Sequence, residues 1–437
     1  MIDLRLLRSD PAQVRAALAR RGDAGIDGLV GDIQNLDARR RVTVTEIDQL
    51  RGKRNAITAD ISKRVRKAGG KVDIPADSEA ERLVRESQAV GGQIDELETT
   101  LSAIDDELNE RLLYVPNLPL PDVPDGPASS NVVVRTWGTP RPAGADVKPH
   151  WEIGERLGLF DLPRGAKLAG SGFPVFVGAG ARLVRALLQL MLDLHTRQHG
   201  YIEVAPPFVV RREMMEGTGQ LPKFADDAYR TTEDELYLVP TAEVPLTNLY
   251  RDEILDGARL PIAHTAYTPC FRREAGAAGK DTRGLLRVHQ FDKVELVRFV
   301  RPADSERELE QLTSHAEAVL QLLELPYRVV ALAAGDLGFS AAKTYDLEAW
   351  APGVGAWLEV SSASTFTDFQ ARRAGIRFRA AKGEKPEFVH TLNASGVALP
   401  RTIAALLETR QAPDGSVSLP RALVPYMGSE RLAAAGA

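Results

Sequence analysis

Two runs of apolar residues, spaced alternately three and four apart, constrain the fold more than any other feature of the sequence. Each run extends for about four heptads, which is the pattern of a coiled coil. The first run consists of Ile33, Leu36, Arg40, Val44, Ile47, Leu50, Arg54, Ile57 and Ile61, and the second of Leu83, Ser87, Val90, Ile94, Leu97, Leu101, Ile104, Leu108 and Leu112. Residues 67–75 separate them and contain two glycines and a proline, which permit a chain reversal. The pattern predicts an antiparallel helical arm over about residues 29–113.

The charge on this predicted arm is uneven. Its first helix and turn are rich in Arg and Lys, whereas its second helix is rich in Asp and Glu. Pairing between the two helices explains part of this distribution. The basic residues near the tip have few acidic neighbours in sequence, so we expect them to contact the phosphates of a nucleic acid. The residues concerned are Lys63, Arg64, Arg66 and Lys67.

Composition excludes several classes of protein. The 437 residues carry a net charge of −5, so any nucleic-acid binding must come from a local patch. The single cysteine, Cys270, excludes a disulfide within the chain and a zinc site of several cysteines. We find no secretory signal and no apolar run of about 18 residues, which predicts a cytoplasmic protein without a membrane span.

A proline-rich stretch over residues 114–141 marks a boundary between two predicted domains, 1–113 and 114–437. The second domain contains strand-like runs at 132–134, 173–177, 201–204, 236–239, 262–272, 285–298, 327–332, 357–363 and 388–392, and helical runs at 179–198, 304–324 and 402–411. Consecutive strands with spaced helices predict an α+β fold, in which helices back an antiparallel sheet. No P-loop and no strand–GxGxxG–helix unit is present, so any ATP site must be built in another way.

Charged residues interrupt the two strand-like runs between Thr268 and Arg298. Unpaired buried charge is costly, so these side chains predict either a bound ligand or a buried network of ion pairs. Arg272 suits a phosphate, Glu274 could accept from an exocyclic amine, and Phe291 could stack on a purine. The intervening loop, Ala275–Gly284, adds Lys280, Asp281 and Arg283.

Polar residues also gather at three other places. Thr241 and Glu243 could hold a small polar group and an ammonium, although a capping box explains them equally well. Glu359 is followed by Ser361 and Ser362, which suits a magnesium ion beside phosphates or, alternatively, the polar side of an edge strand.

The last of these places is the stretch Asn393–Gly396, which precedes a helix with Arg401 in its first turn. Small residues there let a ligand approach the backbone. An arginine is unfavourable at a helix N-terminus unless an anion lies nearby. Arg401 therefore predicts a phosphate partner, the alternative being a surface arginine.

With these motifs, the sequence resembles the bacterial seryl-tRNA synthetases, class II aminoacyl-tRNA synthetases, along essentially its whole length. The segment GYIEVAPP resembles motif 1, FRREAGAAGKDTRGLLRVHQF resembles motif 2, and NASGVALPRTIAALLE resembles motif 3. TAEVPLTN and LEVSSAS resemble the seryl branch in particular. The resemblance implies a class II catalytic fold with an antiparallel sheet of six to eight strands, and an N-terminal tRNA-binding arm.

The resemblance also implies a reaction and its partners. ATP and L-serine would form seryl-adenylate with Mg²⁺, and the seryl group would pass to tRNA(Ser), and to tRNA(Sec) where that tRNA exists. Motif 1 implies a homodimer. The implied ATP-site residues are Arg272, Arg273, Glu274, Arg287, Val288, Phe291, Glu359, Val360, Ser361, Ser362 and Arg401. The implied serine-site residues are Thr241, Ala242, Glu243, Arg272, Glu295, Asn393 and Ser395.

Within these sets the resemblance gives individual roles. Arg272, Arg401 and Glu359 are the implied catalytic residues, and Glu359 with Ser362 would hold the metal ion. Arg272 would bind the α-phosphate, whereas Arg287 and Arg401 would bind the outer phosphates.

Three positions depart from the family pattern, namely Arg273, Thr365 and Ala394. Strand alternation predicts that Arg273 points away from Arg272 and Glu274. Two alternatives compete with the synthetase. The first is a paralogue that charges another acceptor, such as a carrier protein, although such relatives tend to lack the arm. The second is an inactive, nucleic-acid-binding paralogue, which would be expected to lose at least one of the charged site residues.

Overall fold

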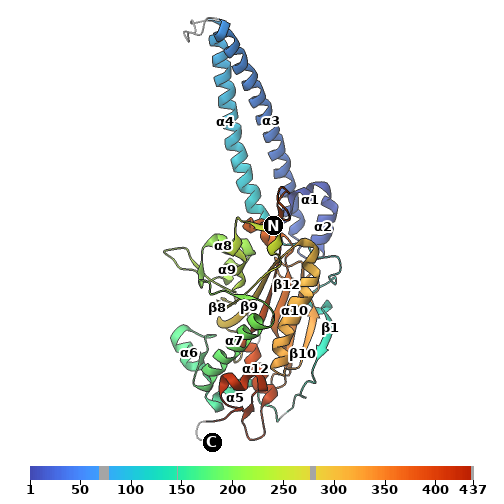
Figure 1. Cartoon of the computed structure of the whole chain (residues 1–437), viewed down its shortest axis with the longest axis vertical. Coiled ribbons are helices and arrows are strands. Elements are labelled where there is room, and N and C mark those ends of the chain that lie inside the picture. The colour runs from blue at the N-terminus through green and yellow to red at the C-terminus, as the bar shows by residue number, and fades with distance from the viewer. Residues whose placement is uncertain (68–77, 145, 276–281, 435–437) are drawn as a thin grey trace. The chain divides into compact units, whose positions relative to one another are not determined.

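A computed structural model describes residues 1–67, 78–144, 146–275 and 282–434 (Figure 1). The chain forms two compact units, one of Asp3–Arg15 with Asp23–Val115 and the other of Met1–Ile2, Ala16–Gly22 and Pro116–Ala437. Most of the expected reversal at 67–75, and Lys280 and Asp281 of the expected hairpin loop, lie outside the described residues. Among the described residues, no helix has the length and apolar character needed to cross a membrane.

Two long helices, α3 (Ile26–Lys67) and α4 (Glu79–Leu112), lie side by side in the first unit (Figure 1). Ser78 caps α4, because its side chain accepts a hydrogen bond from the Glu81 amide at 3.2 Å. The predicted seam positions Ile47 and Ile94 are each 2% exposed and belong to one apolar cluster. The predicted coiled-coil arm is therefore confirmed.

Ion pairs cross between these two helices, as the distribution of charge allowed. They join Arg40 to Asp105 at 2.5 Å, Arg51 to Glu98 at 2.7 Å, Lys53 to Glu86 at 2.9 Å and Arg64 to Glu79 at 2.6 Å. Lys63 forms no ion pair with another described residue. Arg66 and Lys67 end α3, and their side chains lie outside the described part of the chain.

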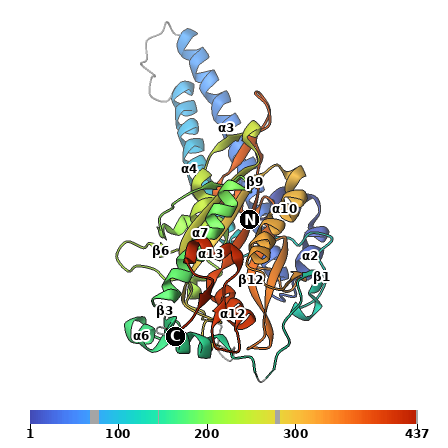
Figure 2. The ribbon, with the colours of Figure 1, turned by 60° about the horizontal axis from the view of Figure 1, so that its bottom comes forward.

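The second unit is built on an eight-stranded sheet (Figure 2). Its strands, in spatial order, are β1 (Val132–Trp137), β10 (Tyr327–Ala331), β11 (Lys343–Ala351), β12 (Ala356–Thr365), β15 (His390–Ala398), β9 (Gln290–Val300), β8 (Ile262–Phe271) and β4 (Ile202–Glu203). Every neighbouring pair is antiparallel except β4 with β8. The sheet and the helices beside it confirm the predicted α+β class.

Alternation along β9 separates the two faces of the sheet. Val294 and Leu296 pack in the main core with residues of α7 (Ala179–Arg197), α10 (Ser305–Leu322) and α12 (Leu399–Arg410). Val297 and Phe299 face the other way and pack with α9 (Glu243–Thr247) and α11 (Phe369–Ala374). By the same alternation, Lys293 and Glu295 belong to that second face.

Shorter elements complete the two units. These are α1 (Leu4–Ser9), α2 (Pro11–Ala19), α5 (His150–Leu157), α6 (Leu162–Ala169), α8 (Arg212–Thr218), α13 (Val424–Met427), β2 (Phe160–Asp161), β3 (Val175–Phe176), β5 (Val209–Val210), β6 (Tyr237–Leu238), β7 (Ile254–Asp256), β13 (Arg377–Arg379), β14 (Glu387–Phe388), β16 (Val417–Ser418) and β17 (Arg431–Leu432).

Two details of the predicted hairpin were wrong. β9 begins at Gln290 rather than at residue 285, because the chain turns at Gly284, where φ is +63°, and stays irregular through residue 289. β8 ends at Phe271, so Arg272 and Glu274 lie beyond the strand, and Glu274 has a φ of +53°. β11 had no counterpart among the predicted strands.

Candidate active site

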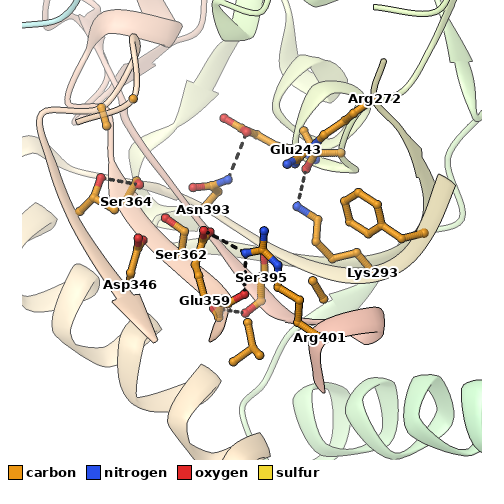
Figure 3. A pocket seen from close by; sticks show the side chains of 18 of the residues that line it. Glu243, Arg272, Lys293, Asp346, Glu359, Ser362, Ser364, Asn393, Ser395 and Arg401 are labelled. Atoms are coloured by element: carbon orange, nitrogen blue, oxygen red, sulfur yellow. Dashed lines mark hydrogen bonds and ion pairs between the residues drawn. The ribbon is translucent and has the colours of Figure 1, made fainter. Parts of the chain in front are cut away.

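A cavity of about 490 Å³ opens on the second face of the sheet (Figure 3). β9, β12 and β15 supply its floor, and α9 and the first turn of α12 contribute to its sides. The sequence-predicted residues that line it are Thr241, Glu243, Arg272, Glu274, Arg287, Val288, Phe291, Glu359, Val360, Ser361, Ser362, Asn393, Ser395 and Arg401. Thr241 and Arg401, which are 160 positions apart in the sequence, thus meet in one cavity.

Three predicted residues do not line the cavity. Arg273 lies outside it, with its guanidinium carbon 5.7 Å from the centre of the Tyr229 ring. Ala242 is fully buried before α9. Glu295 is also fully buried and acts on the cavity only through the residues that it contacts.

A hydrogen-bonded network closes one end of the cavity. Thr241 donates to Glu295 Oε2 at 2.9 Å, and Lys293 Nζ donates to Thr241 Oγ1 at 3.1 Å. Lys293 Nζ also lies 2.5 Å from Glu295 Oε2. Asn393 Nδ2 bridges two carboxylates, at 3.0 Å from Glu295 Oε1 and 3.1 Å from Glu243 Oε2. Every member is therefore held in place by the others.

Glu243 is the carboxylate of this network that lines the cavity. Burial and the nearby charge of Glu295 raise the pKa of Glu243 to about 7. Gln370 Nε2 donates to its Oε1 at 2.6 Å. Glu243 forms no ion pair with any described residue, so an external ammonium group could supply its missing counter-charge.

The cavity lining also carries an aromatic ring and two arginines, of which Arg272 lies beside Glu243 (Figure 3). The guanidinium carbon of Arg272 lies 5.2 Å from the centre of the Phe291 ring, and Arg272 Nε donates to the Pro240 carbonyl at 3.3 Å. Arg287 forms an ion pair with Glu274. The alternative of an ion-pair network is thus correct for part of the hairpin, yet Arg272 forms no ion pair with a described carboxylate.

Arg401 projects from the first turn of α12 (Figure 3). Its Nε donates to the Leu286 carbonyl at 3.0 Å, and its Nη1 donates to the Glu359 carbonyl at 3.0 Å. The same nitrogen lies 3.3 Å from Glu359 Oε2. An anion in the cavity would lie against both this guanidinium and the positive end of the helix.

A group of oxygen atoms on β11 and β12 lines the cavity near Arg401. Asp346 pairs with Ser362 across the two strands, and Asp346 Oδ1 is a buried atom without a hydrogen-bond partner. Burial and the charge of Glu359 hold the pKa of Asp346 well above its usual range, while a hydrogen bond from Ser362 opposes them. A carboxyl in this situation suits a cation as its missing partner.

The sequence interpretation missed Asp346 and Lys293. Lys293 was read only as part of a strand, although alternation places it on the same face as Glu295. Asp346 lies on β11, whose alternation of Thr344, Asp346 and Glu348 with more apolar residues was the signal available.

The departures from the family pattern lie outside the cavity lining. Thr365 is buried, with its Oγ1 3.0 Å from Ser305 Oγ, and Ala394 is fully buried in the main core.

Comparison with known proteins assigns the family. Residues 1–119 match the family model for the seryl-tRNA synthetase N-terminal domain, and residues 224–410 match the class II tRNA synthetase core domain (G, H, P, S and T). A curated relative, the serine–tRNA ligase of Gemmatimonas aurantiaca, is 57% identical over 434 residues, covering 99% of this chain and 100% of the relative. The chain belongs to the seryl-tRNA synthetase family. Members are class II aminoacyl-tRNA synthetases, so this chain is an enzyme of that class.

Other relatives agree with this family assignment. The serine–tRNA ligase of Pelotomaculum thermopropionicum is 54% identical over 98% of this chain and 99% of the relative. The seryl-tRNA synthetase of Pyrococcus horikoshii, solved in complex with ATP, has a TM-score of 0.92 at 39% identity, over 99% of this chain and 100% of that one. The serine–tRNA ligase of Naegleria fowleri, solved in complex with AMP, has a TM-score of 0.86 at 30% identity, over 100% of this chain and 99% of that one.

Proposed function

We propose that this chain is a serine–tRNA ligase that works in two steps within the cavity. A carboxylate oxygen of serine attacks the α-phosphorus of ATP, and the bond to diphosphate breaks. A hydroxyl of the terminal ribose of tRNA(Ser) then attacks the seryl carbonyl carbon, and AMP leaves. The observation that carries this proposal is a single cavity whose lining brings together a carboxylate without an ion-pair partner among the described residues, Glu243, and the phosphate-binding candidates Arg272 and Arg401.

Two arginines would bind the phosphates of ATP. Arg272 takes the α-phosphate, because its guanidinium lies over Phe291, the ring proposed to stack on adenine. Arg401 takes an outer phosphate together with Arg287. Glu274 accepts from the adenine edge, close to the backbone of Val288. Catalysis then rests on positioning and charge neutralisation, with no nucleophile from the protein.

Serine would occupy the network end of the cavity. Its ammonium group lies against Glu243, and its hydroxyl exchanges hydrogen bonds with Thr241, Asn393 and the Ser395 region. Alanine leaves these buried polar groups unsatisfied, which disfavours its binding. Threonine would have to be refused by a lack of room for its methyl group.

The oxygen atoms on β11 and β12 fit a magnesium ion. Mg²⁺ prefers oxygen ligands and is commonly held by one or two carboxylates together with substrate phosphates. Asp346, with a buried oxygen that lacks a partner, and Glu359 and Ser362 beside it are such a set. Among the described residues no cluster of three or more His, Cys, Asp or Glu is placed to bind a metal, so ATP oxygens would complete the shell. The ion would supply neutralisation of phosphate charge.

The arm, within a domain of residues 1–113, would bind tRNA(Ser), and tRNA(Sec) where it exists, through phosphates near residues 63–67. Residues 114–437 would form the catalytic domain, and the enzyme would act in the cytoplasm. A homodimer is supported by the edge strand β4 and the loop after it, where Ile202 is 63% exposed and Phe208 is 42% exposed. Sedimentation of the Ile202→Asp variant as a monomer would support that interface, and an unchanged dimer would place it elsewhere.

The proposed function is tested by ATP–diphosphate exchange with each amino acid in turn, followed by charging of total tRNA. Serine alone should support exchange, and tRNA(Ser) should be charged. Exchange driven better by another amino acid would contradict the serine assignment. Exchange without tRNA charging would instead favour the paralogue with another acceptor.

A further inference from the structure

A buried histidine outside the cavity contacts two of the segments that line it. His150 begins α5 and is fully buried, and its ring bridges Glu408 on α12 and Leu285 of the cavity lining. Leu285 N donates to His150 Nε2 at 2.9 Å, and His150 Nδ1 lies 2.7 Å from Glu408 Oε1. Since an amide N–H can only donate, Nε2 is the acceptor and Nδ1 carries the proton.

Glu408 holds the ring in this tautomer and orientation. Its carboxylate is fully buried and accepts from the His150 amide at 2.9 Å, and from the Gly353 and Val354 amides at 2.8 and 3.0 Å. A carboxylate that accepts from several fixed donors cannot rotate freely, so it fixes the imidazole in turn.

The other end of α12 contacts the next residue, Leu286, through Arg401. Arg401 and Glu408 are seven residues apart, about two turns of α12, and therefore share one face. Arg401 holds the Leu286 carbonyl at 3.0 Å, whereas Glu408 holds the Leu285 amide through His150. Two successive residues of the cavity lining, Leu285 and Leu286, are thus fixed to one helix, directly before Arg287 and Val288 of the same lining.

The approach of His150 leaves no space for a side chain at residue 284. A Cβ atom on Gly284 would lie 2.3 Å from His150 Nε2, and the residue has a φ of +63°. The chain therefore turns at Gly284 directly against the imidazole and then carries Leu285 past it.

We propose that His150, held by Glu408, is a positioning residue for ATP, which sets the place of Leu285 and hence of Arg287 and Val288. This inference rests on the proposed location of ATP. His150 touches no substrate, and it acts through the backbone that follows the motif 2 loop.

A matched pair of variants tests this role. Glutamine reaches about as far as Nε2 and can accept from the Leu285 amide, whereas asparagine reaches only about as far as Nδ1. In serine-dependent exchange, His150→Asn should raise the KM for ATP about tenfold, the effect of removing about one hydrogen bond, and His150→Gln should stay within about threefold of the wild type. The KM for serine should stay within about twofold in both variants.

Equal behaviour of the two variants, or an equal rise in both KM values, would overturn the proposal. Arg401→Ala separates it from the function itself. If ATP lies elsewhere, Arg401→Ala leaves the KM for ATP unchanged. If only the role of His150 is wrong, Arg401→Ala raises the KM for ATP, and the two His150 variants have equal KM values for ATP. Should His150→Asn not fold, hydrogen exchange of the wild-type Leu285 amide decides: slow exchange supports the proposal, and exchange as fast as that of an exposed amide overturns it.

Discussion

Thr241 donates its hydroxyl proton to Glu295 across 2.9 Å, although 54 positions separate the two residues in the chain. The threonine comes from the turn before α9 and the glutamate from the middle of β9. Lys293 and Asn393 complete the same network, so the polar groups of the proposed serine pocket are ordered before a substrate arrives. Such pre-organisation lowers the cost of orienting groups during the reaction.

Arg272 is expected to be essential, and its neighbour Arg273 dispensable. Arg272→Ala removes the guanidinium beside the proposed α-phosphate and should lower serine-dependent exchange by about 100-fold or more. Arg273→Ala removes the same charge from outside the cavity, so its exchange rate should stay within about twofold of the wild type. The two variants are compared by their kcat/KM for ATP. Similar losses of kcat/KM in both variants would mean that exchange depends on net charge rather than on contact between Arg272 and ATP.

Serine activation is expected to weaken in acid. The pKa of Glu243 is raised to about 7, so the carboxylate is ionised above that pH and neutral below it. A neutral Glu243 no longer attracts the serine ammonium, so kcat/KM for serine should fall about tenfold per pH unit below pH 7. Glu243→Gln should have a low kcat/KM that is flat between about pH 6 and 8. A sloping profile in that variant would assign the titration to another group.

Asp346→Asn tests the proposed magnesium site. Removing one carboxylate should raise the Mg²⁺ concentration needed for half-maximal exchange severalfold, and should weaken Mn²⁺ binding in the presence of an ATP analogue, measured by electron paramagnetic resonance. The substitution also removes a buried carboxyl whose charged form is disfavoured by burial and by Glu359, so the metal-free protein should melt higher, by about 2–4 °C. Glu348→Gln is the control, because Glu348 pairs with Arg328 and does not line the cavity. Unaltered Mn²⁺ binding in Asp346→Asn would exclude this residue as a ligand.

Basic residues near the end of α3 are expected to set the salt dependence of tRNA binding. Replacing Lys63, Arg64, Arg66 and Lys67 with alanine should reduce the slope of log K against log salt by about 0.7–0.9 for each tRNA phosphate that the arm no longer neutralises. Arg51→Ala with Lys53→Ala is the control, because these residues lie earlier in α3 than residues 63–67 and both pair with α4, with Glu98 and Glu86. If the control variant flattened the slope as much, the binding surface would lie further along the arm.

Periodic features of the sequence predicted much of the fold. The heptads located α3 and α4, and the apolar runs located β8, β10, β12 and the three long helices, because burial on one face leaves a regular spacing. The start of β9 was missed because Leu285–Val288 is as apolar as a strand. The turn at Gly284 and the hydrogen bond from the Leu285 amide to His150, which only the structure shows, explain why this segment is irregular.

The candidate site was predictable where charge interrupted an apolar strand, as at Arg272 and Glu359. Residues that act through a partner left weaker signals. In the sequence, Asp346 looked like any polar residue of a strand. Its proposed role as a metal ligand depends on a buried oxygen atom that the fold leaves without a hydrogen-bond partner. The contact of His150 with Glu408 spans 258 positions, and no local pattern encodes it.

The alternation along β9 limits how this protein can change its length during evolution. Val294 and Leu296 fill the main core, while Lys293 and Glu295 belong to the proposed serine pocket. Inserting or deleting one residue in this strand would turn the charges into the core and the apolar side chains into the pocket. Stability and chemistry would be lost together, without a viable intermediate. Insertions and deletions are therefore expected to accumulate in the loops of the catalytic unit, while β9 keeps a constant length.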